Sequence, residues 1–150
     1  VKHVNGDVFG INKQNLMTPM AVDTAAAIKN FMSPISKKSF FVDAEIVGNQ
    51  LHVFDIKEVD GESYFDQRTL TDRLNILNML AEKNSSPLVS VVRTASNTES
   101  KKTMLADIQR FNLEGVAVKS LSDENAQFKF KFYEECSVLV SSHTEGKRSV

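Results

Sequence analysis

Hydrophobic and polar positions alternate along four stretches in the first part of the chain, and a two-residue turn joins the members of each pair. The stretches are residues 1–4 and 7–11 around Asn5-Gly6, and residues 39–47 and 50–56 around Gly48-Asn49. Alternation with a period of two is typical of strands, and turns of this composition connect antiparallel neighbours. The pattern therefore predicts two β-hairpins.

Three other stretches repeat their hydrophobic residues with the period of an α-helix. The repeats are Ala25, Ile28 and Met32; Leu70, Leu74, Leu77 and Leu80; and Met104, Leu105 and Ile108. We expect the first helix to be capped by Asp23 or Thr24 and the second to run from about residue 71 to 83. Ser96 to Glu99 has the pattern of a capping box and predicts the start of the third helix.

Later strands are expected at residues 88–93, 115–120, 127–133 and 137–141. Most strands come as hairpins with helices inserted between them. This order favours an α+β domain with antiparallel sheets over a doubly wound parallel sheet. The length of 150 residues suits one domain, residues 1–150, with a sizeable core.

Composition narrows the function only slightly. The net charge of −1 gives no overall attraction to nucleic acid or membrane, although a local basic patch would suffice for binding. A single cysteine, Cys136, excludes an intramolecular disulfide, and we expect a buried thiol in a reducing, cytoplasmic compartment. The three histidines show no zinc-ligand spacing with Cys136.

Lysine and phenylalanine alternate at residues 128–132. In a strand, the three phenylalanines share one face, and Lys129 and Lys131 stand together on the other. Two adjacent ammonium groups repel each other unless an anion lies over them. Water and nearby glutamates could supply this compensation, and so could a bound phosphate. Taken alone, the alternation favours a solvated lysine face. The stretch at residues 113–119 just upstream shifts the interpretation towards a phosphate, through the resemblance described next.

Four stretches resemble, in order, sequence motifs of the covalent nucleotidyltransferase superfamily, which contains ATP-dependent DNA ligases, RNA ligases and mRNA capping enzymes. They are residues 41–47, 51–56, 113–119 and 128–132. The first keeps both acidic residues of an Asp-Gly-Glu pattern, with Ala44 in place of the glycine. The second keeps Phe-Asp, the third Glu-Gly and a closing lysine, and the fourth a pair of lysines. Asp60-Gly61 and Arg73, expected on a helix surface, also fit ligases.

The resemblance implies two antiparallel β-sheets flanked by helices around a nucleotide-binding cleft. Lys129 and Lys131 are similar to the paired lysines that contact the α-phosphate, and Glu114 to a glutamate near the metal or the base. Magnesium and ATP would be the cofactor and co-substrate. The alternative for these residues is a solvated lysine face with a glutamate at a turn.

The resemblance also places Glu45 at the ribose, Phe54 against the base, and Lys119 near the base or phosphate. A carboxylate in so apolar a stretch is costly unless it is exposed or paired, so an open cleft or plain solvent must face Glu45. For Phe54 the alternative is core packing. We expect Glu45, Glu114, Lys129 and Lys131 to converge on one cleft.

The nucleophilic lysine of the family lies in a Lys-x-Asp-Gly motif, and no such motif occurs in these residues. We therefore expect a partial adenylation domain, or a relative without its nucleophile, and no covalent AMP adduct on this chain. The C-terminal oligonucleotide-binding barrel that the family pairs with this core is also absent from the sequence.

The first hypothesis is the adenylation core of an ATP-dependent polynucleotide ligase of DNA repair or replication, a monomer acting on nicked DNA or, alternatively, on RNA. The second is a ligase-like module that binds nucleotide or nucleic acid without catalysis. The third is a structural α+β domain with chance matches. Residues preceding Val1 would discriminate the first two.

Overall fold

The computed structural model describes residues 1–123 and 126–132. Its strands are β1 (Lys2–Val4), β2 (Asp7–Ile11), β3 (Met17–Thr18), β4 (Phe40–Val47), β5 (Gln50–Val59), β6 (Glu62–Ser63), β7 (Val89–Val91), β8 (Gly115–Lys119) and β9 (Gln127–Lys131). Its helices are α1 (Val22–Met32), α2 (Tyr64–Gln67), α3 (Leu70–Lys83) and α4 (Thr98–Arg110).

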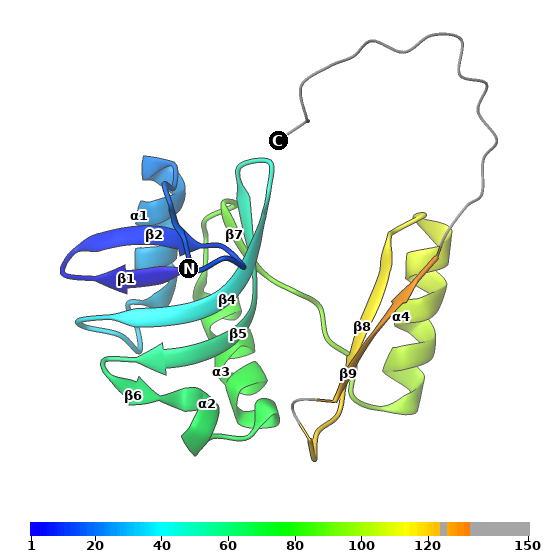
Figure 1. Ribbon diagram of the computed structural model, residues 1–150. Coiled ribbons are helices and arrows are strands. Elements are labelled where there is room, and N and C mark those ends of the chain that lie inside the picture. Colours follow the sequence, from blue (N-terminus) through cyan, green and yellow to red (C-terminus); the bar gives the residue numbers. More distant parts are fainter. Residues whose placement is uncertain (124–125, 133–150) are drawn as a thin grey trace, which may run out of the picture.

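The larger sheet has the strand order β3-β2-β1-β4-β5-β6, and β7 joins it by pairing with β5 (Figure 1). Both predicted hairpins are confirmed, because β1 pairs with β2 and β4 with β5, each antiparallel. The register around the Gly48-Asn49 turn begins at Val47 and Gln50, as expected for a two-residue turn. This register fixes every cross-strand neighbour near the turn.

Helices α1 and α3 cover one face of this sheet (Figure 1). The buried side chains at this interface come from both layers: Ile28, Phe31, Met32, Leu77 and Leu80 from the helices, and Val42, Leu51, Val53 and Ile56 from the strands. Because strand residues alternate between faces, the neighbours of Leu51 and Val53 point away from the helices. The helical layer thus leaves the other face of β4 and β5 for polar side chains.

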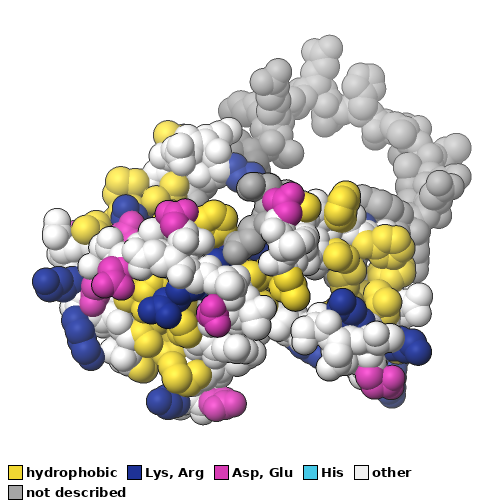
Figure 2. Space-filling model, turned by 90° about the horizontal axis from the view of Figure 1, so that it is seen from below, with side chains coloured by type: hydrophobic (Ala, Val, Ile, Leu, Met, Phe, Trp, Pro, Cys, Tyr) yellow, Lys and Arg dark blue, Asp and Glu magenta, His cyan; other side chains and the backbone are white. Residues whose placement is uncertain are grey.

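A smaller part follows, in which α4 lies beside the antiparallel β8–β9 hairpin (Figure 1). Ile108 is its buried hydrophobic residue, whereas Val118, Phe128 and Phe130 are 53%, 70% and 57% exposed. Yellow hydrophobic side chains gather on this part in Figure 2. This exposed patch shows that the hairpin has little core of its own.

The α+β class is confirmed, and several finer predictions change. Strand β7 pairs parallel to β5, so the larger sheet is mixed and not purely antiparallel. The second sheet has two strands within the described ranges. The strand expected at 137–141, and Cys136 beside it, lie outside those ranges. No helix in the described part of the chain is long and apolar enough to cross a bilayer.

Two predicted helix caps were wrong. Helix α1 begins after Ala21, with no side-chain cap, and Thr24 is buried with its hydroxyl bonded to Asn49. Helix α4 is capped one residue later than predicted, because Asn97 accepts a hydrogen bond from the Ser100 N–H at 2.8 Å. The predicted hydrophobic stripe was right in α1, whereas in α4 Ile108 is buried, Met104 is half-buried and Leu105, expected on the core side, is 40% exposed.

Candidate functional site

Glu45 and Phe54 lie on the face of β4 and β5 that points away from the helices. Glu45 lies in the exposed end of β4, beyond the buried Phe40 and Val42, and pairs with His52 across the hairpin. The register then shifts, because Asp43 pairs with Asp55 while Ala44 pairs with Val53. Phe54 is therefore the extra residue of a β-bulge, a device that redirects a side chain. Phe54 is half-buried, and Glu45 is exposed opposite His52, two residues before Phe54 on β5.

The smaller part of the molecule reaches this face through Lys119. The Lys119 ammonium lies 5.5 Å from the centroid of the Phe54 ring, within the range of a cation–π contact. Lys119 ends β8 and Phe54 lies in the middle of β5, so the contact joins the two sheets. It brings together two of the residues that the sequence singled out.

A second pair of predicted residues meets at the far end of β8. Lys131 forms an ion pair with Glu114, and Lys129 lies two residues away on the same strand. The hydrogen bond from Lys131 lowers the pKa of Glu114, and the charges of Lys131 and Lys129 lower that pKa further. Glu114 therefore supplies the negative charge beside both lysines, one of the two arrangements that their alternation allowed.

Gly115 explains why Glu114 can stand so close to β9. Its φ of +148° is open to glycine and strained for other residues. A Cβ at this position would lie 2.1 Å from the carbonyl oxygen of Phe130. The Glu-Gly pair thus lets the chain enter the hairpin with Glu114 opposite Lys131.

The predicted residues therefore come together as two groups, Phe54 with Lys119 and Glu114 with Lys131. Lys129 belongs electrostatically to the second group. Glu45 pairs with His52, which lies two residues before Phe54 on β5. Convergence of all of them on one nucleotide cleft stays a prediction.

Arg73 was predicted on a helix surface, and this is wrong. Its side chain is fully buried and forms a bidentate ion pair with Asp55, with distances of 2.7 Å to Oδ1 and 3.1 Å to Oδ2. The periodicity of α3 could not reveal this, because the partner charge lies on β5. Lys57 also contacts Asp55 at 3.2 Å, and its ammonium lies 3.8 Å from the centre of the Phe65 ring. The cluster anchors β5 just after the bulge at Phe54.

Sequence reasoning also missed His52 and Ser90. The Ser90 hydroxyl and the Nδ1 atom of His52 are 2.9 Å apart, between β7 and β5. The hairpin register could have placed His52 opposite Glu45, because the two-residue turn determines it. Nothing local to the sequence could have placed Ser90, since β7 reaches β5 only through the parallel pairing.

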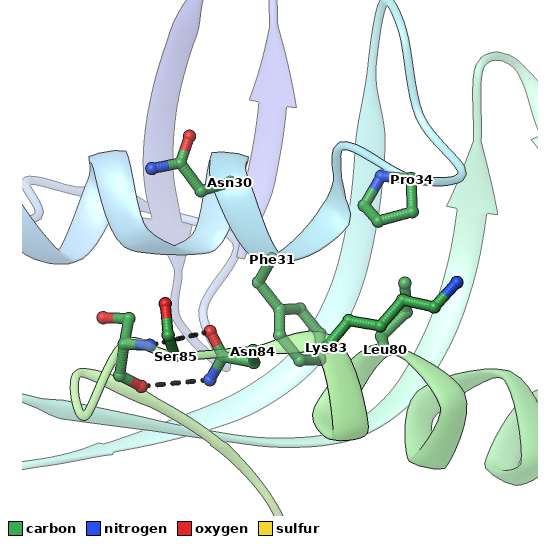
Figure 3. Close-up of a pocket in the computed structure, with 8 residues that line it drawn as sticks. Asn30, Phe31, Pro34, Leu80, Lys83, Asn84 and Ser85 are labelled. Carbon is green, nitrogen blue, oxygen red and sulfur yellow. Dashed lines mark hydrogen bonds between the residues drawn. The ribbon is translucent and has the colours of Figure 1, made fainter.

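Two cavities lie elsewhere on the molecule. One, of about 140 Å³, opens between the C-terminal ends of α1 and α3 (Figure 3). Its Asn84 side chain bonds the backbone of Ser86, as the dashed lines show, and therefore serves the local turn. The other, of about 230 Å³, is lined by His3, Lys29 and Lys37 among others. Neither is lined by a residue predicted for the site.

Metal binding by protein groups alone finds no support in the described ranges, where no three His, Cys, Asp or Glu side chains are grouped to hold an ion. Glu114, the predicted metal contact, is engaged by Lys131. A single carboxylate suits magnesium only when phosphates and waters complete its coordination.

No family model, curated protein or solved structure matches this chain. Two contacts among the candidate residues bear on function. One is the Lys119 ammonium over the Phe54 ring, and the other is the ion pair of Glu114 with Lys131.

Proposed function

We propose that this chain is part of the adenylation core of an ATP-dependent polynucleotide ligase that acts on nicked DNA. The core binds ATP with magnesium. The amine of a lysine attacks the α-phosphorus, pyrophosphate leaves, and AMP then passes to a 5′-phosphate end. In phosphoryl transfer of this kind the protein contributes mainly positioning and charge stabilisation.

The contact between Lys119 and Phe54 carries this proposal. It supports a composite site, because an aromatic ring from one sheet and a cation from the other meet on the face that also holds Glu45. A half-buried aromatic ring beside a carboxylate suits a nucleoside, whose base can stack while its sugar offers hydroxyl groups. A base on the same side of the ring would displace the Lys119 ammonium towards the phosphates.

The lysine pair of β9 supports the phosphate end of the proposal. Lys129 and Lys131 stand on one side of the strand, and Glu114 lies beside Lys131. Phosphate oxygens would accept charge-assisted hydrogen bonds from both ammonium groups. In this arrangement Glu114 would contact magnesium that arrives with the phosphates, because phosphate oxygens complete the coordination of the ion.

Calorimetric titration of the 150-residue chain with ATP and magnesium tests the proposal. We expect saturable binding. Phe54→Ala should weaken it by roughly tenfold or more, because base–aromatic stacking is worth about 1–3 kcal/mol. Lys119→Ala should weaken it less, because the lysine contributes charge and no stacking surface.

Matched controls come from the same molecule. Phe111 is 60% exposed at the end of α4, and Lys102 is exposed on the same helix, so Phe111→Ala and Lys102→Ala should leave ATP affinity unchanged. Absence of ATP binding by the wild-type chain, or equal losses in the site and control variants, would reject the proposal.

A further inference from the structure

Three strands contribute one side chain each to a row across the face that carries Phe54. Ser90 of β7 pairs in register with His52 of β5, and His52 pairs in register with Glu45 of β4. Side chains directly opposite each other on neighbouring strands have Cβ atoms about 4.5–5.5 Å apart. The row therefore places a hydroxyl, an imidazole and a carboxylate side by side.

The His52 side chain points away from the core, because Leu51 and Val53 on either side of it are fully buried there. It is itself only half-buried, and Glu45 is exposed. The imidazole and the carboxylate thus lie opposite each other across the hairpin, and Phe54 follows two residues along β5. The Lys119 ammonium lies 5.5 Å from the centroid of the Phe54 ring.

Ser90 fixes the orientation of the His52 ring through a hydrogen bond. Its hydroxyl holds Nδ1 at 2.9 Å on the β7 side of the ring. When the hydroxyl donates to Nδ1, the proton of the neutral imidazole resides on Nε2, which makes Nε2 a donor. A serine that orients the ring in this way also reduces the rotamer freedom that would be lost when a ligand binds.

We propose that His52, oriented by Ser90, recognises the sugar hydroxyls of the bound nucleotide together with Glu45. The inference rests on the proposed function and deepens it. Vicinal hydroxyl groups both donate and accept hydrogen bonds. The carboxylate of Glu45 accepts from one hydroxyl, and the Nε2 of His52 donates to the other. The site thereby selects ribonucleotides over nucleotides that lack these hydroxyls, and Ser90 acts as a positioning residue.

The test compares the affinities of ATP and 2′,3′-dideoxy-ATP, each with magnesium, by calorimetry on the full chain. Wild type should prefer ATP, and His52→Ala should reduce the affinity ratio by roughly tenfold, as expected for one lost hydrogen bond. His52→Gln carries an amide outward and should keep much of the ratio. His52→Asn can still reach Ser90 but is too short to reach outward, so it should behave like His52→Ala. Ser90→Ala should reduce the ratio by only a few-fold.

Glu58→Ala, on the same strand beyond the bulge, is the control and should leave the ratio unchanged. A wild-type chain that binds neither nucleotide would overturn the proposed function together with this inference. A chain that binds ATP with the same ratio in wild type and in all His52 variants would overturn this inference alone. Loss of both affinities by the same factor in His52→Ala and His52→Gln would also overturn it, because it would assign His52 a structural role.

Discussion

Asp55 and Arg73 are two opposite charges buried between β5 and α3, with exposed fractions of 1% and 0%. Asp55 accepts two hydrogen bonds from Arg73, one from Lys57 and one from the Ile56 N–H. Burial alone would raise the pKa of Asp55, but the bonds and charges of Arg73 and Lys57 outweigh it and lower the pKa. The carboxylate therefore stays ionised near neutral pH, and the buried guanidinium has the partner that its burial requires.

At the residue scale, Arg73→Met should lower the free energy of unfolding by about 3–5 kcal/mol, because it leaves the Asp55 charge buried without its main partner. The measurement is urea unfolding followed by circular dichroism. Arg93→Ala is the matched control, since Arg93 pairs with Asp107 at the surface and is 59% exposed. Its loss should stay below about 1 kcal/mol. Equal losses in the two variants would contradict a structural role for the buried pair.

At the scale of elements, Asp60 ties the β5–β6 turn to the segment between α1 and β4. Its carboxylate accepts hydrogen bonds from the backbone N–H groups of Ser39, Lys37 and Lys38 at 2.7–2.9 Å. These bonds hold the pKa of Asp60 well below its ordinary value, and the bond from the Ser39 N–H has the largest effect. Because the folded-state pKa is lowered, the resulting stability is present above the unfolded pKa and is lost as the pH falls through the folded one.

We expect Asp60→Asn to lower the melting temperature at pH 7, where the wild-type carboxylate is fully charged. The difference from wild type should narrow as the pH falls below about 4 towards 2, because Asp60 of the unfolded wild-type chain then takes up a proton while the folded carboxylate stays charged. Melting curves at pH 7, 4, 3 and 2 provide the measurement. Glu62→Gln, an exposed carboxyl on β6, is the control. A difference that stays constant over this pH range would argue against the charge of Asp60.

The β8–β9 hairpin requires glycine at position 115, because there is no room for a side chain between Gly115 and β9. Gly115→Ala should separate the strands where Glu114 meets Lys131, because the new methyl group would overlap the Phe130 carbonyl. Hydrogen exchange of the hairpin amides should accelerate by roughly tenfold or more. Gly48→Ala, also at positive φ but with open space around it, should leave this hairpin unaffected. Unchanged exchange in Gly115→Ala would show that the hairpin tolerates the methyl group.

Local signals predicted both hairpins and the three long helices, because turns and periodicity act within a few residues. They failed where the deciding partner lies far along the chain. Arg73 is buried because Asp55 lies across from it, and β7 is parallel because it packs beside β5. The bulge at Phe54 was also invisible, since alternation alone assumes an unbroken register. Of the candidate site, the pairing of Glu45 with His52 could have been deduced from the two-residue turn.

At the scale of the whole molecule, hydrophobic burial is unevenly distributed. Within the described ranges, every buried hydrophobic residue except Ile108 lies between residues 1 and 89. The smaller part meets the larger sheet through Lys119 at Phe54, the contact on which the proposed nucleotide site depends. A part with few buried contacts opens with a low free energy. A ligand that bridges the two parts should therefore stabilise the smaller one most.

Hydrogen exchange with and without ATP and magnesium tests this view. Without nucleotide, amides of β8 and β9 should exchange at least about tenfold faster than those of β4 and β5, because their opening exposes little hydrophobic surface. Saturating ATP should slow exchange in β8 and β9 and change that of β5 mainly around Phe54. In Phe54→Ala the effect of ATP on β8 and β9 should largely disappear, because the shared ring is missing. Protection by ATP confined to the cavity between α1 and α3, with β8 and β9 unaffected, would place nucleotide binding elsewhere and contradict a site shared by the two sheets.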